Sequence, residues 1–457
     1  MKIITQNYEN DKKVSSSIMN FFKKYKISSI LKASNAYKSK GIPVINLFQY
    51  LFSLIFTNRS MYMNMLTGKH KENFAKDTVY RFLNSSSINW TKFTSLLAAK
   101  VANTTITNLT DEKRVNVLII DDTMFERSSS KKVELLCKVY DHAKNTYKNG
   151  FRLLTLGWSD GNTFLPVNSC LLSSANAKTR INEAKKLDKR SIGFKRRSLA
   201  QTKATTVMLD LIDSAKKAKI PASHVLFDTW FCSPSSLIAI KSKDLDVIAM
   251  AKKTSKMHYL YNGVMQPLTE IYKQNKKRRG RSKYLLSVEI TVVKNGESIP
   301  ARIVYVRNKN KRKDYLALIT TDMKISEEEV IRIYGKRWDI EVFFKVCKSY
   351  LKLSKECNSL SYDAMNAHVA IVFTRYMMLA VENRNTTDNR TLGEIFHLIS
   401  DELSDITWIE AFHMLLQLFM NTLSDKLSLT SEQLDKIMNS FLLALPKQFK
   451  GSLGLCA

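Results

Sequence analysis

Two short apolar runs, each ending at an aspartate, constrain the fold of this chain more than any other feature. Val115–Ile120 is followed by Asp121 and Asp122, and His224–Phe227 is followed by Asp228. Short runs that are rich in β-branched residues indicate buried strands. A predicted hairpin and a basic helix separate the two runs, and a helix and another strand follow the second. This alternation of strands and helices predicts an α/β layered core.

Other elements follow from apolar alternation and from turn signals. Further strands are predicted at Phe151–Trp158, Phe164–Leu172, Val247–Ala251, Tyr284–Val293, Ala301–Val306 and Tyr315–Thr320, and helices at Ile42–Asn58, Lys76–Asn84, Ala200–Lys219 and Ser233–Lys243. A long helix is predicted from Ser326 to about Tyr350, because Ser326 and the acids after it form a capping signal. Asp77 is the predicted N-cap of the helix that ends at Asn84.

These elements divide the chain into five predicted segments. Residues 1–110 are a helical domain, and 111–253 are the first part of the α/β core. Residues 254–321 are a β-rich insertion, and 322–357 return to the core with the long helix. Residues 358–457 form a helical C-terminal domain, a candidate for dimerisation.

The charge of the chain points to a polyanionic partner. Its 72 basic residues exceed its 41 acidic residues, which gives a net charge of +31. The alternative is a solvated, lysine-rich surface, because lysine far outnumbers arginine, as in proteins of AT-rich genomes. The six cysteines form no CxxC motif and indicate free thiols in a reducing compartment. No apolar run reaches the ~20 residues of a membrane span, so the sequence predicts a soluble, cytoplasmic protein.

The predicted long helix carries a polar stripe. Tyr334, Arg337, Glu341 and Lys348 follow one another at spacings of three, four and seven residues. At about 100° per residue they fall within an arc of roughly 60°, and Lys345 joins the same edge. The alternative is a solvated stripe held by ion pairs within the helix, each worth about 0.2–0.5 kcal/mol. The apolar residues around the stripe favour a site instead.

At these residues the sequence resembles a known family. Tyr334-x2-Arg337-x3-Glu341-x6-Lys348 is similar to the YREK signature of insertion-sequence transposases of the IS-four family. Val117–Thr123 (VLIIDDT) and Val225–Phe231 (VLFDTWF) resemble the two strands that carry the family's catalytic aspartates. The resemblance implies a ribonuclease-H-like catalytic core with a β-strand insertion, flanked by helical domains, of which residues 1–110 are the expected DNA-binding domain. It also implies that Asp121, Asp228 and Glu341 form the catalytic triad, and it favours Asp121 over Asp122.

Three carboxylates make a hard oxygen site, which suits Mg²⁺ or Mn²⁺. Two such ions are expected, because a metal pair activates the nucleophile and stabilises the leaving oxygen at phosphorus. Arg337 and Lys348 are expected to hold phosphates, and Tyr334 to hydrogen-bond a phosphate oxygen. Trp338 is a candidate for stacking on an unpaired base, with core packing as the alternative.

A basic run, Lys273–Lys283, is expected to contact the DNA backbone, with a solvated loop as the alternative. Its candidate contacts are Lys276, Lys277, Arg278, Arg279 and Arg281. The function implied by the resemblance is cleavage of double-stranded DNA at inverted-repeat ends and joining to target DNA, by a homodimer. The alternatives are a stand-alone metal-dependent nuclease and an inactive relative that acts as a DNA-binding protein.

Overall fold

The protein is described by a computed structural model, which covers residues 17–56, 60–66, 72, 74–111, 114–141, 144–278, 282–308, 311, 314–385, 392 and 431–444. The chain splits into two compact units. The first comprises Met1–Ile55 and Ser60–Ile395, and the second comprises Phe56–Arg59 and Phe396–Ala457. In the second unit the structure describes one helix, α16 (Ser431–Ala444). The sheet and the candidate site belong to the first unit.

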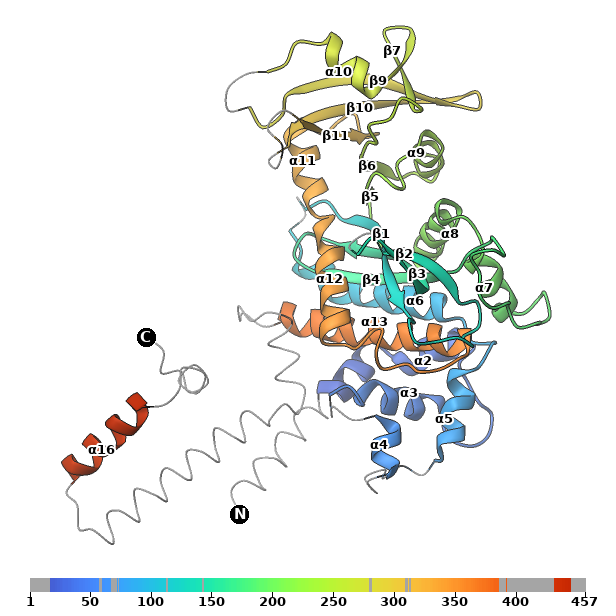
Figure 1. Cartoon of the computed structure of the whole chain (residues 1–457), viewed down its shortest axis with the longest axis vertical. Coiled ribbons are helices and arrows are strands. Elements are labelled where there is room, and N and C mark those ends of the chain that lie inside the picture. Colours follow the sequence, from blue (N-terminus) through green and yellow to red (C-terminus); the bar gives the residue numbers. More distant parts are fainter. Residues whose placement is uncertain are drawn as a thin grey trace. The chain divides into compact units, whose positions relative to one another are not determined.

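One mixed sheet organises the first unit (Figure 1). Its strands follow the order β2-β3-β1-β5-β6-β11-β10-β9-β7-β8, and β4 pairs with β3 beside β2. The central strands are β1 (Val117–Glu126), β3 (Thr146–Ser159), β4 (Phe164–Leu172), β5 (His224–Phe227) and β6 (Asp246–Met250). β1, β5 and β6 are parallel, whereas β3 and β4 are antiparallel to their neighbours. This mixed sheet fits a ribonuclease-H-like core.

β1 is longer than the sequence pattern predicts. The predicted strand ends before Asp121, but β1 continues to Glu126. The reason is its partner β3, which pairs with β1 without a break from Val117↔Ser159 to Glu126↔Gly150. Only the parallel pairing with β5 stops early, after Ile119↔Leu226. The aspartates therefore mark the place where two parallel strands separate, and not the end of β1.

The predicted β-rich segment continues the same sheet. It contains β7 (His258–Tyr261), β8 (Val264–Pro267), β9 (Leu286–Lys294), β10 (Glu297–Arg307) and β11 (Tyr315–Thr320), together with α10 (Leu268–Gln274). β11 pairs with β6 antiparallel, and β10 and β9 follow outward. β2 (Cys137–Asp141) lies at the opposite end of the sheet. These strands extend the central sheet, so the segment shares its hydrogen bonding with the core.

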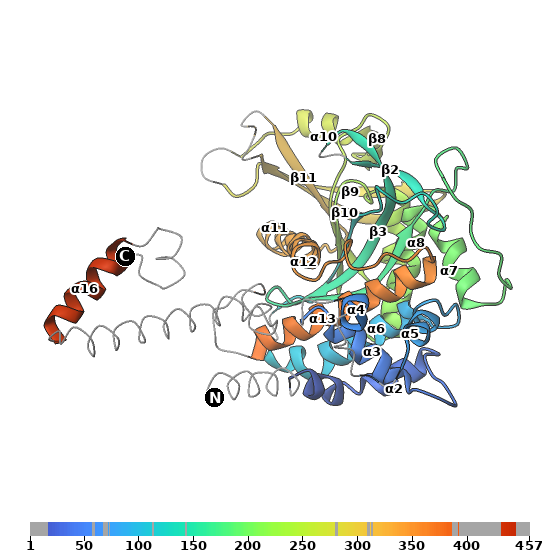
Figure 2. The same cartoon turned by 60° about the horizontal axis from the view of Figure 1, so that its bottom comes forward.

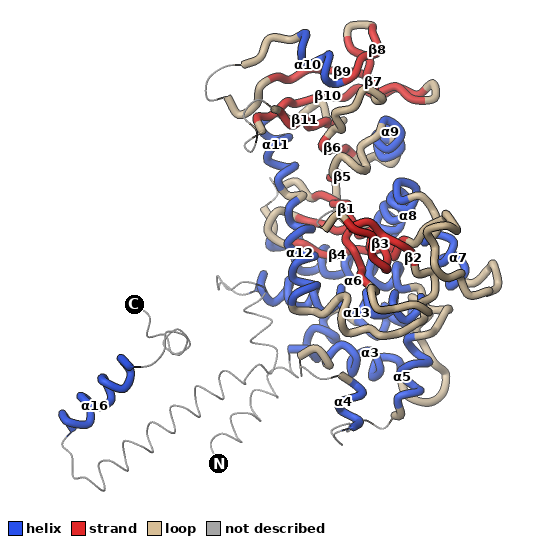
Figure 3. The backbone as a smooth tube through the Cα atoms, viewed as in Figure 1, coloured by secondary structure: helices blue, strands red, loops and turns tan. Residues whose placement is uncertain are grey.

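Helices surround the sheet (Figure 3). The first hundred residues include α2 (Ile27–Ala33), α3 (Val44–Ser53), α4 (Met61–Leu66), α5 (Lys76–Leu83) and α6 (Trp90–Val101). The α6 helix continues into a π-helical turn (Ala102–Ile106) and a 3₁₀ turn (Thr107–Leu109). After β4 come α7 (Ile192–Ala200), α8 (Ala204–Lys217) and α9 (Pro234–Lys241).

The N-terminal helices are joined to the core by packing. α6 contacts β4, α8 and α13 (Tyr362–Asn385). The amide of Asn168 on β4 donates to Ser95 Oγ of α6 at 3.0 Å and to the Leu211 carbonyl of α8 at 3.0 Å.

The predicted cap of α5 is wrong: α5 begins at Lys76, its N-cap position is Ala75, and Asp77 lies in its first turn.

The predicted long helix is two helices, α11 (Glu327–Gly335) and α12 (Trp338–Ser349). Ser326 caps α11 as predicted, and its Oγ accepts from the Glu329 N–H. The chain tightens between the helices, because the N–H groups of Lys336 and Arg337 bond to carbonyls three residues back. Lys336 turns inward, and its Nζ donates to the Val115 carbonyl at 2.5 Å and to the Asp160 carbonyl at 3.2 Å. These two hydrogen bonds hold the buried side chain of Lys336 at the break between α11 and α12.

The helix α13 is the one described helix that is long and apolar enough to cross a membrane, over Tyr362–Arg384. In its apolar window of 18 residues, 94% is buried in the protein. Its Arg375 is 1% exposed and donates to the Phe52 carbonyl at 3.0 Å. The same guanidinium forms an ion pair with Glu356. A buried, fully paired arginine and this degree of burial are typical of a core helix.

Candidate active site

Two predicted site residues follow the paired part of β1 and β5 at the same end of the two strands. Val117, Leu118 and Ile119 pair with His224, Val225 and Leu226. The pairing ends there, and Asp121 and Asp228 each follow two residues after the last pair, at the same end of the two strands. The charge of Asp228 acts on Asp121, which agrees with this placement. The two carboxylates therefore share the point where β1 and β5 diverge.

The helix α12, which contains the third carboxylate, Glu341, lies beside the central strands (Figures 1 and 2). α12 packs against β1 and β4, and α11 packs against β6 and β11. One guanidinium connects the elements: Arg337 donates to Asp121 Oδ2 at 3.2 Å and also to Glu341 Oε1. Further along α12, Lys348 Nζ donates to Thr123 Oγ1 at 2.6 Å. Alternation along β1 puts Asp121 and Thr123 on the same face, so α12 lies across that face.

Arg337 thus links Asp121 with Glu341, and Asp228 is near enough for its charge to act on Asp121. All three are oxygen donors, so the set fits a hard divalent cation such as Mg²⁺ or Mn²⁺. In the protein alone Arg337 supplies the positive charge between Asp121 and Glu341, with side-chain exposures of 17%, 19% and 34% for the arginine, the aspartate and the glutamate. A bound cation would compete with this guanidinium for the same carboxylate oxygens.

Burial raises the pKa of Asp121 to about 7, and the nearby charge of Asp228 adds to this effect. The Asp122 N–H, which donates to Asp121 Oδ1 at 2.8 Å, and Arg337 act in the opposite direction. Burial has the larger effect on the pKa, because desolvation disfavours the ionised carboxylate more than these contacts favour it. Near neutral pH the carboxyl of Asp121 therefore exchanges its proton readily, and a metal ion would displace it.

A pH dependence of stability follows from this raised pKa. In the unfolded chain Asp121 ionises near pH 4, whereas the folded protein keeps its proton up to about pH 7. Its contribution to the free energy of unfolding is complete below pH 4 and is lost as the pH rises to 7. Asparagine does not titrate. In EDTA, the stability of Asp121→Asn relative to wild type is expected to increase between pH 4 and 7 by about 1 kcal/mol per pH unit, and to stay constant above 7. Urea unfolding of both proteins at several pH values measures this, and a difference independent of pH would refute it.

The remaining polar residues of the predicted stripe have distinct surroundings. Tyr334 lies on α11, and burial raises its pKa, so the phenol remains a hydrogen-bond donor. Trp338 begins α12 and is 61% exposed, which excludes the alternative of core packing. Lys345 and Lys348 are exposed on α12. The break before Arg337 separates Tyr334 from the other stripe residues, which all lie at or beyond the start of α12.

Asp122 lies on the opposite face of β1 and has a different partner. It forms an ion pair with Arg152 of β3. A cavity of about 720 Å³ opens beside this part of β1. Its lining includes Asp122, Arg152, Trp230 and Lys348. Asp121 and Asp122 are thus distinguished by the structure, because the first faces Arg337 beside α12 and the second faces Arg152.

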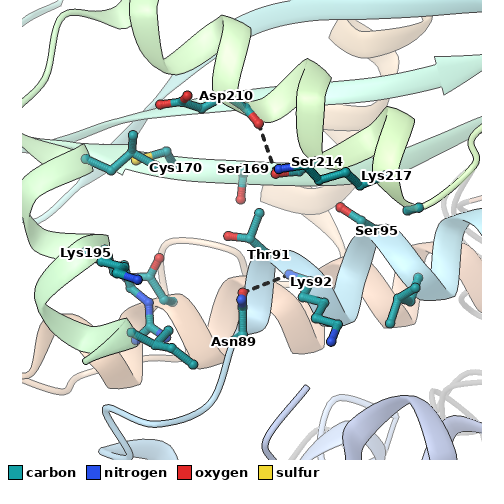
Figure 4. Close-up of a pocket in the computed structure, with 16 residues that line it drawn as sticks. Asn89, Thr91, Lys92, Ser95, Ser169, Cys170, Lys195, Asp210, Ser214 and Lys217 are labelled. Atoms are coloured by element: carbon teal, nitrogen blue, oxygen red, sulfur yellow. Dashed lines mark hydrogen bonds between the residues drawn. The ribbon is translucent and has the colours of Figure 1, made fainter. Parts of the chain in front are cut away.

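A second cavity, of about 540 Å³, lies away from the three carboxylates (Figure 4). Residues of α6, β4, α7 and α8 line it. Several of its polar groups bond within their own helices: Asn89 caps α6 through the Lys92 N–H, and Ser214 donates to the Asp210 carbonyl. Asp121, Asp228 and Glu341 do not line this cavity.

One group of ligand-forming side chains was not predicted from the sequence. His224, Asp246 and Asp322 place their ligand atoms within 4.8 Å of one another. His224 and Asp246 begin β5 and β6, so this group lies at the opposite strand ends from Asp228. His224 Nε2 is 3.1 Å from Asp322 Oδ2, and Asp246 Oδ1 accepts from Lys241 Nζ at 2.5 Å. No spacing in the sequence signals this group, because its third member follows the end of β11.

The basic run lies between α10 and β9. Lys276 and Arg278 are exposed, and Lys277 Nζ lies 4.6 Å from the centre of the Tyr272 ring. The Arg278 guanidinium lies 4.2 Å from the centre of the Tyr284 ring. Arg279 and Arg281 lie outside the described residues. The structure therefore places Lys277 and Arg278 beside aromatic rings of the extended sheet region.

Comparison with known families identifies the superfamily of the chain. The model of a family described as DDE superfamily endonuclease matches residues 46–311, more than half of the chain. The chain therefore belongs to the DDE superfamily of endonucleases. The match includes Asp121 and Asp228 and ends before Glu341. Members of such a family are nucleases that act on DNA with divalent metal ions. No curated protein matches the chain significantly.

Proposed function

We propose that this protein is a transposase of the YREK-bearing, IS-four kind, which cuts DNA at the inverted-repeat ends of an insertion sequence and joins them to target DNA. One observation carries the proposal: Asp121 and Glu341 bond the same arginine, beside Asp228, in a member of the DDE superfamily. The three carboxylates come from β1, the turn after β5, and α12. These are the positions at which the sequence resembles the YREK transposases.

Asp121, Asp228 and Glu341 would hold two Mg²⁺ ions, or Mn²⁺ in their place. When bound, such a pair activates a water or a 3′-hydroxyl and stabilises the leaving oxygen at phosphorus. The raised pKa of Asp121 means that metal binding near neutral pH releases a proton from this carboxyl. Metal affinity therefore increases with pH up to about 7 and changes little above it.

Arg337 has two sets of acceptors in this mechanism. In the protein alone it bonds Asp121 and Glu341, and a DNA phosphate offers the same guanidinium a second pair of oxygens. Transfer of Arg337 to the phosphate frees the carboxylates for cations and brings a positive charge to the reacting group. Lys348 Nζ, which bonds Thr123, is placed to hold a neighbouring phosphate as a point charge.

Other residues are proposed to bind DNA away from the reacting phosphate. The exposed Trp338 ring is a surface for stacking on an unpaired base, and Lys345 contacts the backbone beside it. The basic run, with Lys276, Lys277 and Arg278, contacts more distant phosphates. We propose that two copies act together on the two element ends, in the cytoplasm. The five-segment division of the sequence, including a β insertion and flanking helical domains, belongs to this proposal.

Recognition of the inverted repeat is assigned to the N-terminal helices, with α5 as the candidate recognition helix. Its buried residues are Val79 and Phe82, whereas Tyr80 and Arg81 are exposed. Tyr80→Ala with Arg81→Ala is expected to reduce the preference for repeat DNA over random DNA by about tenfold or more, because a specific bond to a base is worth about 1–3 kcal/mol of discrimination. Competition binding measures this preference. Truncation is unsuitable, because it would remove α6 from β4. An unchanged preference would assign the reading of the repeat to another surface.

A stand-alone nuclease is the second candidate, because the matching family is described as an endonuclease. One experiment separates the two functions. The full chain is incubated with DNA that carries its element ends, a target plasmid and Mg²⁺. The proposed transposase cuts at the repeat ends to leave 3′-hydroxyls and then produces joined molecules. Cleavage without joined products would support the nuclease. Absence of cleavage with intact repeat binding would support an inactive, DNA-binding relative.

A further inference from the structure

Three side chains beside the proposed active site form a connected cluster: Asp122, Arg152 and Trp230. Arg152 lies opposite Met124 in the β1–β3 register, diagonal to Asp122 on the same face of the sheet. Its guanidinium forms an ion pair with Asp122 and lies 5.1 Å from the centre of the Trp230 ring. The arginine thus joins the central hairpin to a residue that follows β5.

Trp230 also contacts the second aspartate of the proposed triad. It lies in the turn directly after β5, and its main-chain N–H donates to Asp228 Oδ1 at 2.9 Å. Its side chain is 56% exposed, so burial in a core does not fix this residue. The contact with Arg152 therefore ties the indole to the sheet, and the N–H of the same residue orients the carboxylate.

We propose that Arg152, anchored by Asp122, is a positioning residue that holds the Trp230 turn and thereby sets the orientation of Asp228. This inference rests on the proposed function, in which Asp228 is a metal ligand. It gives Asp122 a role distinct from that of Asp121. One aspartate of the pair binds metal, and the other holds the arginine that orients the opposite ligand.

A carboxylate ligand can turn freely before the metal binds unless neighbouring groups hold it. β1 and β5 no longer pair at Asp228, so the backbone there lacks the ladder that fixes it elsewhere. Carboxylate ligands are normally oriented by outer hydrogen bonds, and removing such a bond weakens metal affinity or activity by about 10–100-fold. Arginine suits this position because its planar guanidinium pairs with a carboxylate and stacks on an aromatic face at once, whereas lysine does so less well.

The experiment measures Mn²⁺ affinity of the full chain by titration calorimetry without DNA. Arg152→Ala and Trp230→Ala are each expected to weaken Mn²⁺ binding by about tenfold, and Arg152→Lys is expected to recover part of the loss. Trp230→Ala keeps the test independent of folding, because this side chain is mostly solvent-exposed. Tyr147→Ala, which removes a ring that is 68% exposed on the β2–β3 hairpin, is the matched control and should bind Mn²⁺ as wild type does.

Single-turnover cleavage adds a readout that a purely structural role would not change. Excess Mn²⁺ is expected to restore the cleavage rate of Arg152→Ala, while its DNA affinity equals that of wild type. Asp228→Asn serves as the reference. If Asp228→Asn binds Mn²⁺ normally, the metal-ligand assignment fails, and the inference fails with it. If Asp228→Asn loses Mn²⁺ but Arg152→Ala and Trp230→Ala bind it normally, the positioning role alone is overturned.

Discussion

Asp121→Asn is expected to slow DNA cleavage by about 10³-fold or more while DNA affinity stays within a few-fold of wild type. A carboxylate ligand holds metal ions whose charge supplies several kcal/mol of transition-state stabilisation, and each 1.4 kcal/mol removed costs about a factor of ten in rate. The substitution keeps the shape of the side chain and its position beside Arg337. Cleavage is measured in single turnovers with protein in excess, and binding is measured separately in Ca²⁺.

Asp122→Asn is the matched control, because it changes the neighbouring residue by the same atom. Asp122 faces Arg152 and not Arg337, so its substitution reaches the proposed metal site only through Trp230 and Asp228. We expect a fall in cleavage rate of about tenfold. The opposite ranking of the two variants would assign the metal to the other face of β1 and would remove Arg337 and Glu341 from the site.

Local sequence signals were sufficient for the core strands. β4 and β11 have the predicted bounds, and β5 begins and ends as predicted. These strands are short, apolar and bounded by turn residues, so the pattern specifies them without knowledge of their neighbours. The long β1 shows the limit of this reasoning. The second half of β1 begins with polar residues, and it forms a strand because β3 pairs with it along its whole length.

Helical periodicity predicted which residues share a face of α12, but not which residues they contact. Helical periodicity placed Arg337, Glu341 and Lys348 on one face, and all three lie on α12 or at its N-cap. Periodicity did not place Tyr334 on a separate helix, because the inward turn of Lys336 depends on carbonyls of Val115 and Asp160. The pairing of Arg337 with Asp121 was equally hidden, since it joins elements far apart in the sequence. Contacts of this kind depend on tertiary packing, which a single sequence does not encode locally.

Arg337→Ala is expected to depress the chemical step by about 10²–10³-fold, which is typical of removing one preorganised charge from a transition state. It should leave Mn²⁺ binding intact or stronger, because the guanidinium that bonds Asp121 and Glu341 opposes a cation at the same oxygens. Lys348→Ala should show the same fall in rate to a smaller degree. The combined change Lys276→Ala, Lys277→Ala and Arg278→Ala should instead weaken binding to all DNA sequences. It should also lower the salt slope by about 0.9 for each phosphate that is no longer neutralised.

Two measurements separate these outcomes: DNA affinity across a salt series, and the single-turnover cleavage rate at saturating protein. The basic run contacts α11 through the ion pair of Lys283 with Glu328, and the hydrogen bonds and ion pairs of its described residues do not include Asp121 or Glu341, so its neutralisation should not change the rate of the bound complex. Arg337, in contrast, bonds two proposed metal ligands, so its removal should change that rate even when all DNA is bound. If Arg337→Ala weakened only affinity and cut normally once bound, the bonds to Asp121 and Glu341 would have no part in the chemistry. α12 would then be a docking surface for DNA, and the reacting phosphate would have to lie elsewhere on the sheet.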